Sequence, residues 1–220
     1  MTDNSINLYR YEEDLYDQGI TLVCGCDEAG RGPLAGPVVV AACILPPLCH
    51  IDGINDSKQL SKSKREKLYK EIISKALAYN IVYVSVEDID KYNIYEATKM
   101  GMIEAITNLK IKPEHALIDY MPLKDLDMPK TSITHGDALS ASIAAASILA
   151  KVSRDSYMSK MDVKYPNYGF KHNMGYPTKM HIAALEKYGV CPIHRKTFGP
   201  VQKILEENSQ LSFDLFDEEK

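Results

Sequence analysis

The hydrophobic positions of the chain fall into short runs with the length and composition of β-strands, separated by polar segments. The first two runs, at 21–27 and 36–45, are joined by a glycine-rich loop, which predicts an antiparallel pair of strands. Further runs rich in β-branched residues predict strands at 80–87, 114–120 and 132–135. Five strands are enough for one sheet.

Amphipathic segments between the strands predict helices. Ser61 is placed as the N-cap of the second helix. The last long helix is rich in alanine and serine, so it can pack very close to a sheet. The predicted helices are at 8–19, 62–79, 96–109, 138–161 and near 178–188. This alternation predicts an α/β fold, a mixed five-stranded sheet with helices on both faces.

The composition fits a globular protein with a small appendage. The chain has 220 residues, of which 45% are hydrophobic and 25% charged. No apolar run reaches the ~18 residues of a membrane helix, and the N-terminus lacks a signal peptide, so we expect a cytoplasmic protein. We expect an N-terminal helix in 1–20, a main domain over 21–164, a mainly helical cap over 165–205 and an acidic, disordered tail over 206–220.

The net charge of −4 is unevenly distributed. Residues 1–18 carry −4 and residues 206–220 carry −5, which leaves +5 for the body between them. A basic body is compatible with binding phosphate groups. The cysteine count of five is odd, and no second pair of cysteines or histidines stands at zinc spacing from Cys24 and Cys26. Buried free thiols are therefore favoured over a structural zinc site.

Acidic side chains follow the predicted strands. Asp27 and Glu28 are adjacent at the end of the first strand, Asp119 ends the fourth, and Asp137 follows the fifth. Ligands of α/β sheets collect at the carboxyl ends of strands, so we expect these four acids to converge. Clustered carboxylates do not all stay ionised unaided, and Mg²⁺ or Mn²⁺ relieves their repulsion. A helix N-cap at Asp137 and a turn residue at Asp119 remain open as simpler interpretations.

Several motifs together resemble the type 2 ribonuclease H family, ribonuclease HII. They are DEAGRGPLAGPVVVAACIL at 27–45, NDSK at 55–58, LIDY at 117–120, GDALSASIAAASILAKVSRD at 136–155, and the C-terminal YPNYGF, GYPT and HRKTF. The resemblance implies a ribonuclease H-like fold, a two-metal Mg²⁺ or Mn²⁺ site, and endonucleolytic cleavage of RNA in RNA–DNA duplexes. It also implies that a single ribonucleotide embedded in DNA is a characteristic substrate. By motif position, the four metal-binding acids are Asp27, Glu28, Asp119 and Asp137.

The resemblance extends to residues that would bind the substrate. The backbone of Gly30, Arg31 and Gly32 can approach the 2′-hydroxyl that marks a ribonucleotide, although a tight turn with a solvated arginine is the simpler alternative. Tyr176 matches a family tyrosine that packs on the next sugar. Lys58 and Arg195 are candidate phosphate ligands.

Other residues are candidates for a supporting role around the acids. Lys151 and Arg154 are three residues apart on the long helix and would support the carboxylates, or form ordinary salt bridges. His135 stands where the family has lysine, which replaces a permanent charge with one that titrates near neutrality. Asn173 and Met174 stand where histidine and lysine are common.

The acidic tail carries apolar residues that little in a disordered segment could bury. Gln210, Phe213, Leu215 and Phe216 have the spacing of bacterial peptides that bind the replication sliding clamp. We therefore expect the clamp as a partner, with packing of the tail on the chain's own surface as the alternative.

Three alternative functions fit this sequence less well. Ribonuclease HIII normally has an additional N-terminal domain and lacks the Gly-Arg-Gly sequence. A glycosidase would hold two acids apart across a sugar, usually among aromatic residues, but this chain has adjacent acids and no tryptophan. A non-catalytic nucleic-acid-binding module would not need four acids at strand ends. We expect a monomeric nuclease that acts on RNA–DNA hybrids and on DNA containing ribonucleotides, with no membrane association.

Overall fold

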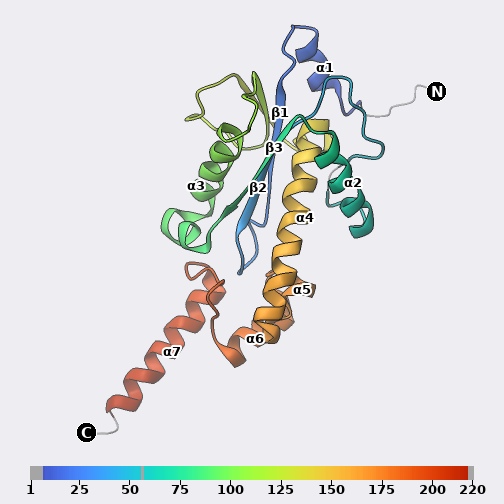
Figure 1. The fold of residues 1–220 in the computed structure, drawn as a ribbon. Coiled ribbons are helices and arrows are strands. Elements are labelled where there is room, and N and C mark those ends of the chain that lie inside the picture. Colours follow the sequence, from blue (N-terminus) through green and yellow to red (C-terminus); the bar gives the residue numbers. More distant parts are fainter. Residues whose placement is uncertain (1–6, 56, 218–220) are drawn as a thin grey trace, which may run out of the picture. The chain divides into compact units, whose positions relative to one another are not determined.

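The computed structural model describes residues 7–55 and 57–217 as helices, strands and connecting loops (Figure 1). The elements in chain order are α1 (Arg10–Tyr16), β1 (Val23–Ala29), β2 (Val38–Ile44), α2 (Lys62–Lys75), β3 (Ala78–Val84), α3 (Val86–Thr107), β4 (His115–Asp119), β5 (Lys130–Ile133), α4 (Ala141–Lys164), α5 (Phe170–Asn173), α6 (Lys179–Tyr188) and α7 (Gly199–Asp217). None of the helices in these residues is both long and apolar enough to cross a membrane.

The chain divides into two compact units. The first contains the described residues up to Ala29 together with Val39–Val84 and Thr98–Ser153. The second contains Gly30–Val38, Ser85–Ala97 and the chain from Arg154 onward. Both units combine separate segments of the chain, and the domain boundary at residue 164 stays a prediction. The glycine loop and the start of α3 belong with the C-terminal region.

The first unit contains the predicted mixed five-stranded sheet. Its strand order is β3-β2-β1-β4-β5. β1 is antiparallel to β2 and parallel to β4, and β4 is parallel to β5. Because β1, β4 and β5 run in the same direction, their carboxyl ends lie at one edge of the sheet. That edge carries Asp27, Glu28 and Asp119, and the turn after β5 carries Asp137.

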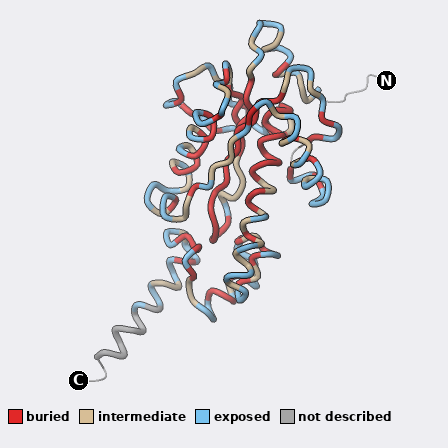
Figure 2. Tube along the Cα trace, in the orientation of Figure 1, coloured by how far each residue is buried: buried red, intermediate tan, exposed pale blue. Residues whose placement is uncertain are grey.

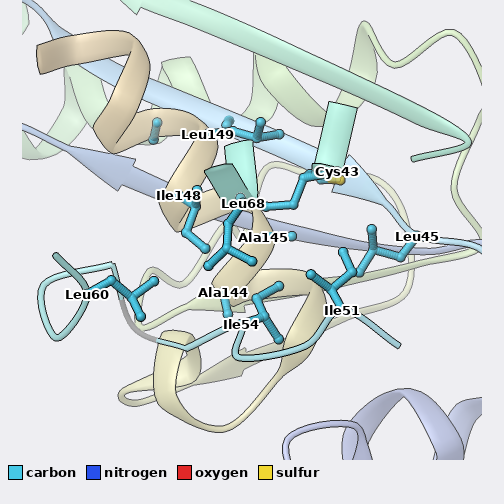
Figure 3. Packing of buried hydrophobic residues seen from close by; sticks show 14 residues of the cluster. Cys43, Leu45, Ile51, Ile54, Leu60, Leu68, Ala144, Ala145, Ile148 and Leu149 are labelled. Carbon is cyan, nitrogen blue, oxygen red and sulfur yellow. The ribbon is translucent and has the colours of Figure 1, made fainter. Parts of the chain in front are cut away.

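Both faces of this sheet are covered, as the alternation of side chains along β2 shows. Ala41 and Cys43 belong to a buried cluster with residues of α2 and α4 (Figure 3). Val40 points to the opposite face, where it lies near Gly101 of α3. Every residue of β2 is buried (Figure 2).

The small residues of α4 allow direct contact between its backbone and the sheet. A Cβ atom added to Gly25 of β1 would lie 2.0 Å from the carbonyl carbon of Ser142. Since β1 and α4 touch backbone to backbone at this point, no larger residue fits there without displacing one of them.

Several predicted boundaries were wrong. β3 begins at Ala78, inside the predicted helix. α3 consists of two helical segments separated by a kink at Asn93, whose φ is 67°; the second segment corresponds to the predicted helix at 96–109, and the first, which begins at Val86, was not predicted. The early start of α3 has a local cause in a capping interaction. The Ser85 hydroxyl accepts a hydrogen bond from the Asp88 backbone N–H and donates one to the Asp88 carboxylate.

The C-terminal tail also differs from its prediction. Instead of disorder from residue 206, α7 continues to Asp217. The prediction weighted the acidic composition and missed the apolar positions of the same segment, which recur at helical spacing.

The second unit has its own apolar core. Tyr168 and Phe170 are buried and stacked, with ring centroids 5.3 Å apart. Around them pack Leu34 and Ala35 of the glycine loop together with Leu185 of α6. Thr178 caps α6 by accepting a hydrogen bond from the His181 N–H.

Candidate active site

Asp27 is the most deeply buried of the four acids and faces α4. Its side chain is 3% exposed, and one carboxylate oxygen accepts the Glu28 N–H at 2.7 Å. The Ser147 hydroxyl of α4 also bonds to it. Burial raises the pKa of Asp27 well above its usual range, and the neighbouring Glu28 and Asp119 raise it further. The structure thus places Asp27, Glu28 and Asp119 close enough for their charges to interact.

Asp119 organises the turn that carries the fourth acid. Its Oδ1 accepts the Gly136 N–H at 2.7 Å. Gly136 packs so tightly that an added Cβ would lie 2.6 Å from Ile143 and 3.3 Å from Asp119 Oδ1. His135 precedes it in the left-handed conformation, with φ of 57°. Asp119 therefore does stabilise a turn through its side chain, and this turn is the one that contains Asp137.

Asp137 lies in a short 3-10 turn before α4 and is 4% exposed. It does not cap α4, because the Ser140 hydroxyl accepts the Ile143 N–H in that position. Instead, Asp137 Oδ2 lies 3.3 Å from the Nζ atom of Lys58. The Lys58 side chain is 76% exposed, so this pair is solvent-screened and contributes little to stability.

Sequence reasoning missed the residues that hold Lys58 and Asp27 in place. The Ser57 hydroxyl is hydrogen-bonded to that of Ser147, the residue that also contacts Asp27. Arg65 of α2 donates to the Ser57 carbonyl at 2.9 Å. Lys151 lies one turn after Ser147, on the same face of α4. Ser147 is one of several serines in an alanine-rich helix, so the sequence did not indicate that this serine contacts Asp27.

The donor set at this sheet edge suits a hard divalent cation. It consists of carboxylate oxygens, the ligands that Mg²⁺ and Mn²⁺ prefer. Among the described residues, however, the side chains as placed do not bring three or more acids, histidines or cysteines together in a group that could hold a metal ion. Burial is the largest cause of the raised pKa of Asp27, and the neighbouring Glu28 and Asp119 raise it further, so a cation bound here would lower that pKa.

In the second unit, two buried arginines determine the shape of the glycine loop. Arg195 is 0% exposed and donates to the carbonyls of Gly30, Arg31 and Gly36. Arg154 is 1% exposed and donates to the carbonyls of Ala35, Pro37 and Met174. This placement differs from both expectations, a phosphate ligand at Arg195 and support of the carboxylates by Arg154.

The arginines also explain why glycine is required at position 30. Gly30 has φ of 97°, and an added Cβ would lie 1.9 Å from Arg154 Nε. Burial lowers the pKa of Arg195 to about 9, with Arg154 as the second cause, so both remain cations at neutral pH. The loop is therefore a rigid, positively charged element.

Tyr176 is exposed beside this loop. Its side chain is 44% exposed, and a Cβ added to Gly32 would lie 3.6 Å from its ring. Asn173, a departure from the family pattern, is structural. Its side chain donates to the Tyr168 carbonyl and accepts the Gly175 N–H. Gln210, Phe213, Leu215 and Phe216 fall in the last turns of α7, where side chains lie outside the described part of the chain.

Comparisons with known proteins show which family the chain is similar to. The family model described as Ribonuclease HII matches residues 24–201. A curated ribonuclease HII from Acholeplasma laidlawii (strain PG-8A) is 55% identical over 203 residues, which are 92% of this chain and 100% of the relative. The solved ribonuclease H2 of Pyrococcus horikoshii OT3 has a TM-score of 0.73 at 30% identity, over 84% of this chain and 97% of that one.

A second solved structure is the PCNA:RNase HII complex from Archaeoglobus fulgidus. It has a TM-score of 0.68 at 27% identity and covers 81% of this chain and 95% of that chain. The family model spans most of the chain, and the identity with the curated relative extends over nearly all of it. The chain therefore belongs to the ribonuclease HII family and is a ribonuclease H, an endonuclease acting on RNA–DNA hybrids.

Proposed function

We propose that the protein is a metal-dependent endonuclease that nicks duplex DNA on the 5′ side of a single embedded ribonucleotide, as well as hydrolysing RNA in hybrids. The products are a 3′-hydroxyl and a 5′-phosphate. The observation that carries the proposal is the buried carboxylate of Asp27, whose pKa is raised by burial and by Glu28 and Asp119. A group of this kind is poised to accept divalent cations.

The four acids have distinct parts in this proposal. Asp27, Glu28, Asp119 and Asp137 would hold two Mg²⁺ or Mn²⁺ ions, which, when bound, supply an activated water and stabilise the leaving oxygen. Asp119 fixes the turn of Asp137 through the Gly136 N–H. Lys58 balances the charge of Asp137 and is mobile enough, at 76% exposure, to turn to a phosphate instead. The 2′-hydroxyl neighbours the 3′ phosphate, so it is badly placed to attack on the 5′ side.

Selectivity for a ribonucleotide would come from the second unit. Gly30, Arg31 and Gly32 present bare backbone, and Arg154 and Arg195 hold that backbone in one conformation. The exposed ring of Tyr176 would pack on the sugar that follows the ribonucleotide. A flat ring accepts a deoxyribose there and disfavours an additional hydroxyl.

A nicking assay tests the proposal. The substrate is a duplex containing one ribonucleotide, incubated with and without Mg²⁺ or Mn²⁺. We expect a single metal-dependent nick from the wild type and none from Asp27→Asn or Asp137→Asn, both of which should still bind the duplex. Asp52→Asn is the matched control, since Asp52 is exposed in a loop. Near-normal turnover by either site variant, or nicking without added metal in the presence of a chelator, would refute the assignment.

A sliding clamp is the proposed partner of the C-terminal segment. The support is the spacing of Gln210, Phe213, Leu215 and Phe216, together with the solved relative in complex with PCNA. Deletion of 210–220 should abolish co-purification with a bacterial clamp while leaving nicking of free duplex unchanged. Replacement of Phe213 and Phe216 by alanine should have the same effect. Undiminished clamp binding by either variant would end the proposal.

A further inference from the structure

Two histidines of the second unit form a hydrogen-bonded chain that ends at the backbone of Tyr176. His181 lies on α6 and His194 on the loop that follows it, and they are 0% and 1% exposed. Their Nε2 atoms are 3.0 Å apart. His181 Nδ1 lies 2.9 Å from the Tyr176 carbonyl oxygen, and the Cys191 N–H donates to His194 Nδ1 at 2.9 Å.

The position of each proton follows from the one fixed donor. A backbone N–H only donates, so His194 Nδ1 accepts and the neutral ring carries its proton on Nε2. That proton points at His181 Nε2, which must accept. The proton of His181 is therefore on Nδ1 and is donated to Tyr176. The Cys191 carbonyl also lies 3.2 Å from His194 Nδ1, but this nitrogen accepts the Cys191 N–H and so carries no proton to donate to it.

The surroundings keep both rings neutral. The stacked rings of Tyr168 and Phe170 lie against the pair, with centroids 5.1 Å from His194 and 5.4 Å from His181 respectively. Burial lowers the pKa of both histidines, and that of His194 falls to about 4 with His181 as the second cause. The titratable neighbours Tyr168 and Cys191 have raised pKa values through burial, so neither supplies a compensating anion at neutral pH.

The chain of hydrogen bonds anchors a turn that exposes the aromatic ring of Tyr176. The Tyr176 carbonyl also accepts the Thr178 N–H at 2.8 Å, and the Tyr176 N–H donates to the Asn173 carbonyl at 2.9 Å. The backbone is thus held from both sides, while the ring is 44% exposed beside Gly32. A tyrosine that only filled the core would have a buried ring, and its backbone would not need to be fixed by additional hydrogen bonds.

We propose that His181 and His194 are positioning residues, which fix the backbone of Tyr176 so that its ring meets the sugar following the ribonucleotide at a set angle. The inference rests on the proposed function and deepens it, because it names what enforces selection at that sugar. Neither histidine touches the substrate. Their loss relaxes the choice of sugar and leaves the metal requirement of the reaction unchanged.

The experiment compares two duplexes, one with a single ribonucleotide followed by deoxyribose and one with two consecutive ribonucleotides. His181→Leu removes the donor to Tyr176. It should reduce the preference for the first duplex by about tenfold, mainly through KM, which corresponds to about 1.4 kcal/mol. His181→Asn places a side-chain N–H near the original Nδ1 position and should restore most of the preference. His172→Leu, an exposed histidine on α5, is the matched control and should behave as wild type.

Each outcome has a distinct meaning. An unchanged preference in His181→Leu, or a failure of His181→Asn to recover any of a lost preference, overturns the positioning role. A wild type that nicks neither duplex overturns the proposed function instead. If His181→Leu does not fold, long-range ¹H–¹⁵N spectra of the wild type decide. They should show His181 protonated at Nδ1 and His194 at Nε2, and any other pair of tautomers refutes the inference.

Discussion

The carboxylate of Glu12 stabilises the start of α4 from outside that helix, and its removal is expected to cost the fold several kcal/mol. Glu12 is 2% exposed on α1. Its Oε1 accepts the Ser140 hydroxyl at 2.6 Å and the Ser142 N–H at 2.8 Å. It thereby satisfies a free donor in the first turn of α4 and places a negative charge at the positive end of that helix.

The magnitude follows from these contacts. Hydrogen bonds to a charged group contribute about 1.5–3 kcal/mol each, and an acid at a helix N-terminus adds about 0.3–1 kcal/mol. Part of this is offset because Glu12→Ala also removes a buried charge, so we expect a net loss of about 3 kcal/mol. For a protein of this size, that loss lowers the Tm by roughly 6–12 °C.

Glu12→Gln separates the hydrogen bond from the charge. It keeps an acceptor for Ser140 and Ser142, so we expect a loss of only about 1 kcal/mol. Glu12 Oε2 and the Ser142 hydroxyl have no partner in the described residues, and both line a pocket of about 10 Å³, near the minimum for one ordered water. Such a water would donate a hydrogen bond to the Glu12 carboxylate but would meet a different group, an amide, in Glu12→Gln. This difference accounts for the loss of about 1 kcal/mol expected for Glu12→Gln.

Denaturant unfolding followed by circular dichroism measures these effects. Glu13→Ala is the matched control on the same helix, since Glu13 is exposed and should stay within about 0.5 kcal/mol of wild type. Glu12→Ala within 1 kcal/mol of the control would refute the reasoning. A Glu12→Gln protein as unstable as Glu12→Ala would show that charge, and not the hydrogen bonds, is what α4 requires.

Three further results are expected. Mn²⁺ at about a hundred times its Kd should stabilise the wild type by about 2.7 kcal/mol in thermal unfolding and should not stabilise Asp27→Asn; equal stabilisation would place the cation elsewhere. Gly25→Ala should destabilise by at least about 3 kcal/mol because its Cβ would overlap the backbone of Ser142, whereas Gly199→Ala, with open space around it, should be tolerated in the same denaturant assay. His194 is neutral in the folded protein and takes up a proton near pH 6.5 when unfolded. Its contribution is therefore intact above that pH and is lost as the pH falls toward about 4, with about 2 kcal/mol gone at pH 5. Stability measured from pH 7.5 to 5 should fall more steeply for wild type than for His194→Leu, and parallel curves would contradict the assignment of a neutral pair.

The sheet and the grouping of Asp27, Glu28 and Asp119 were predictable because each leaves a local signal. Alternating apolar runs indicate strands, and an acid directly after such a run indicates the edge of a sheet where ligands gather. The pairing of β1 with both β2 and β4 follows from the short glycine loop and the helical crossover. The position of Asp27 near the carboxyl end of β1 could therefore be predicted before its burial was known.

The supporting residues were not predictable because their partners are distant in the chain. Arg195 bonds to carbonyls more than 150 positions earlier, and backbone carbonyls have no sequence signature. Ser147 is one serine among several in α4, and only the three-dimensional register selects it as the contact of Asp27. In the sequence, Glu12 is one of several acids in a segment expected to be exposed. Its burial depends on the packing of α1 against the start of α4, where it accepts the Ser142 N–H.

The direct backbone contact at Gly25 has a consequence for how this enzyme can vary. Successive residues of a strand alternate between faces, so Gly25 and Asp27 look toward the same helix, where they meet Ser142 and Ser147. Gly25 allows β1 to approach the backbone of α4 closely. Asp27, two residues further along the same face of β1, is thereby also brought close to α4. Shifting the strand by one residue would turn Asp27 to the far side of the sheet and bring Glu28 against the helix. An insertion or deletion of one residue between Gly25 and Asp27 would therefore remove one of these two contacts with α4.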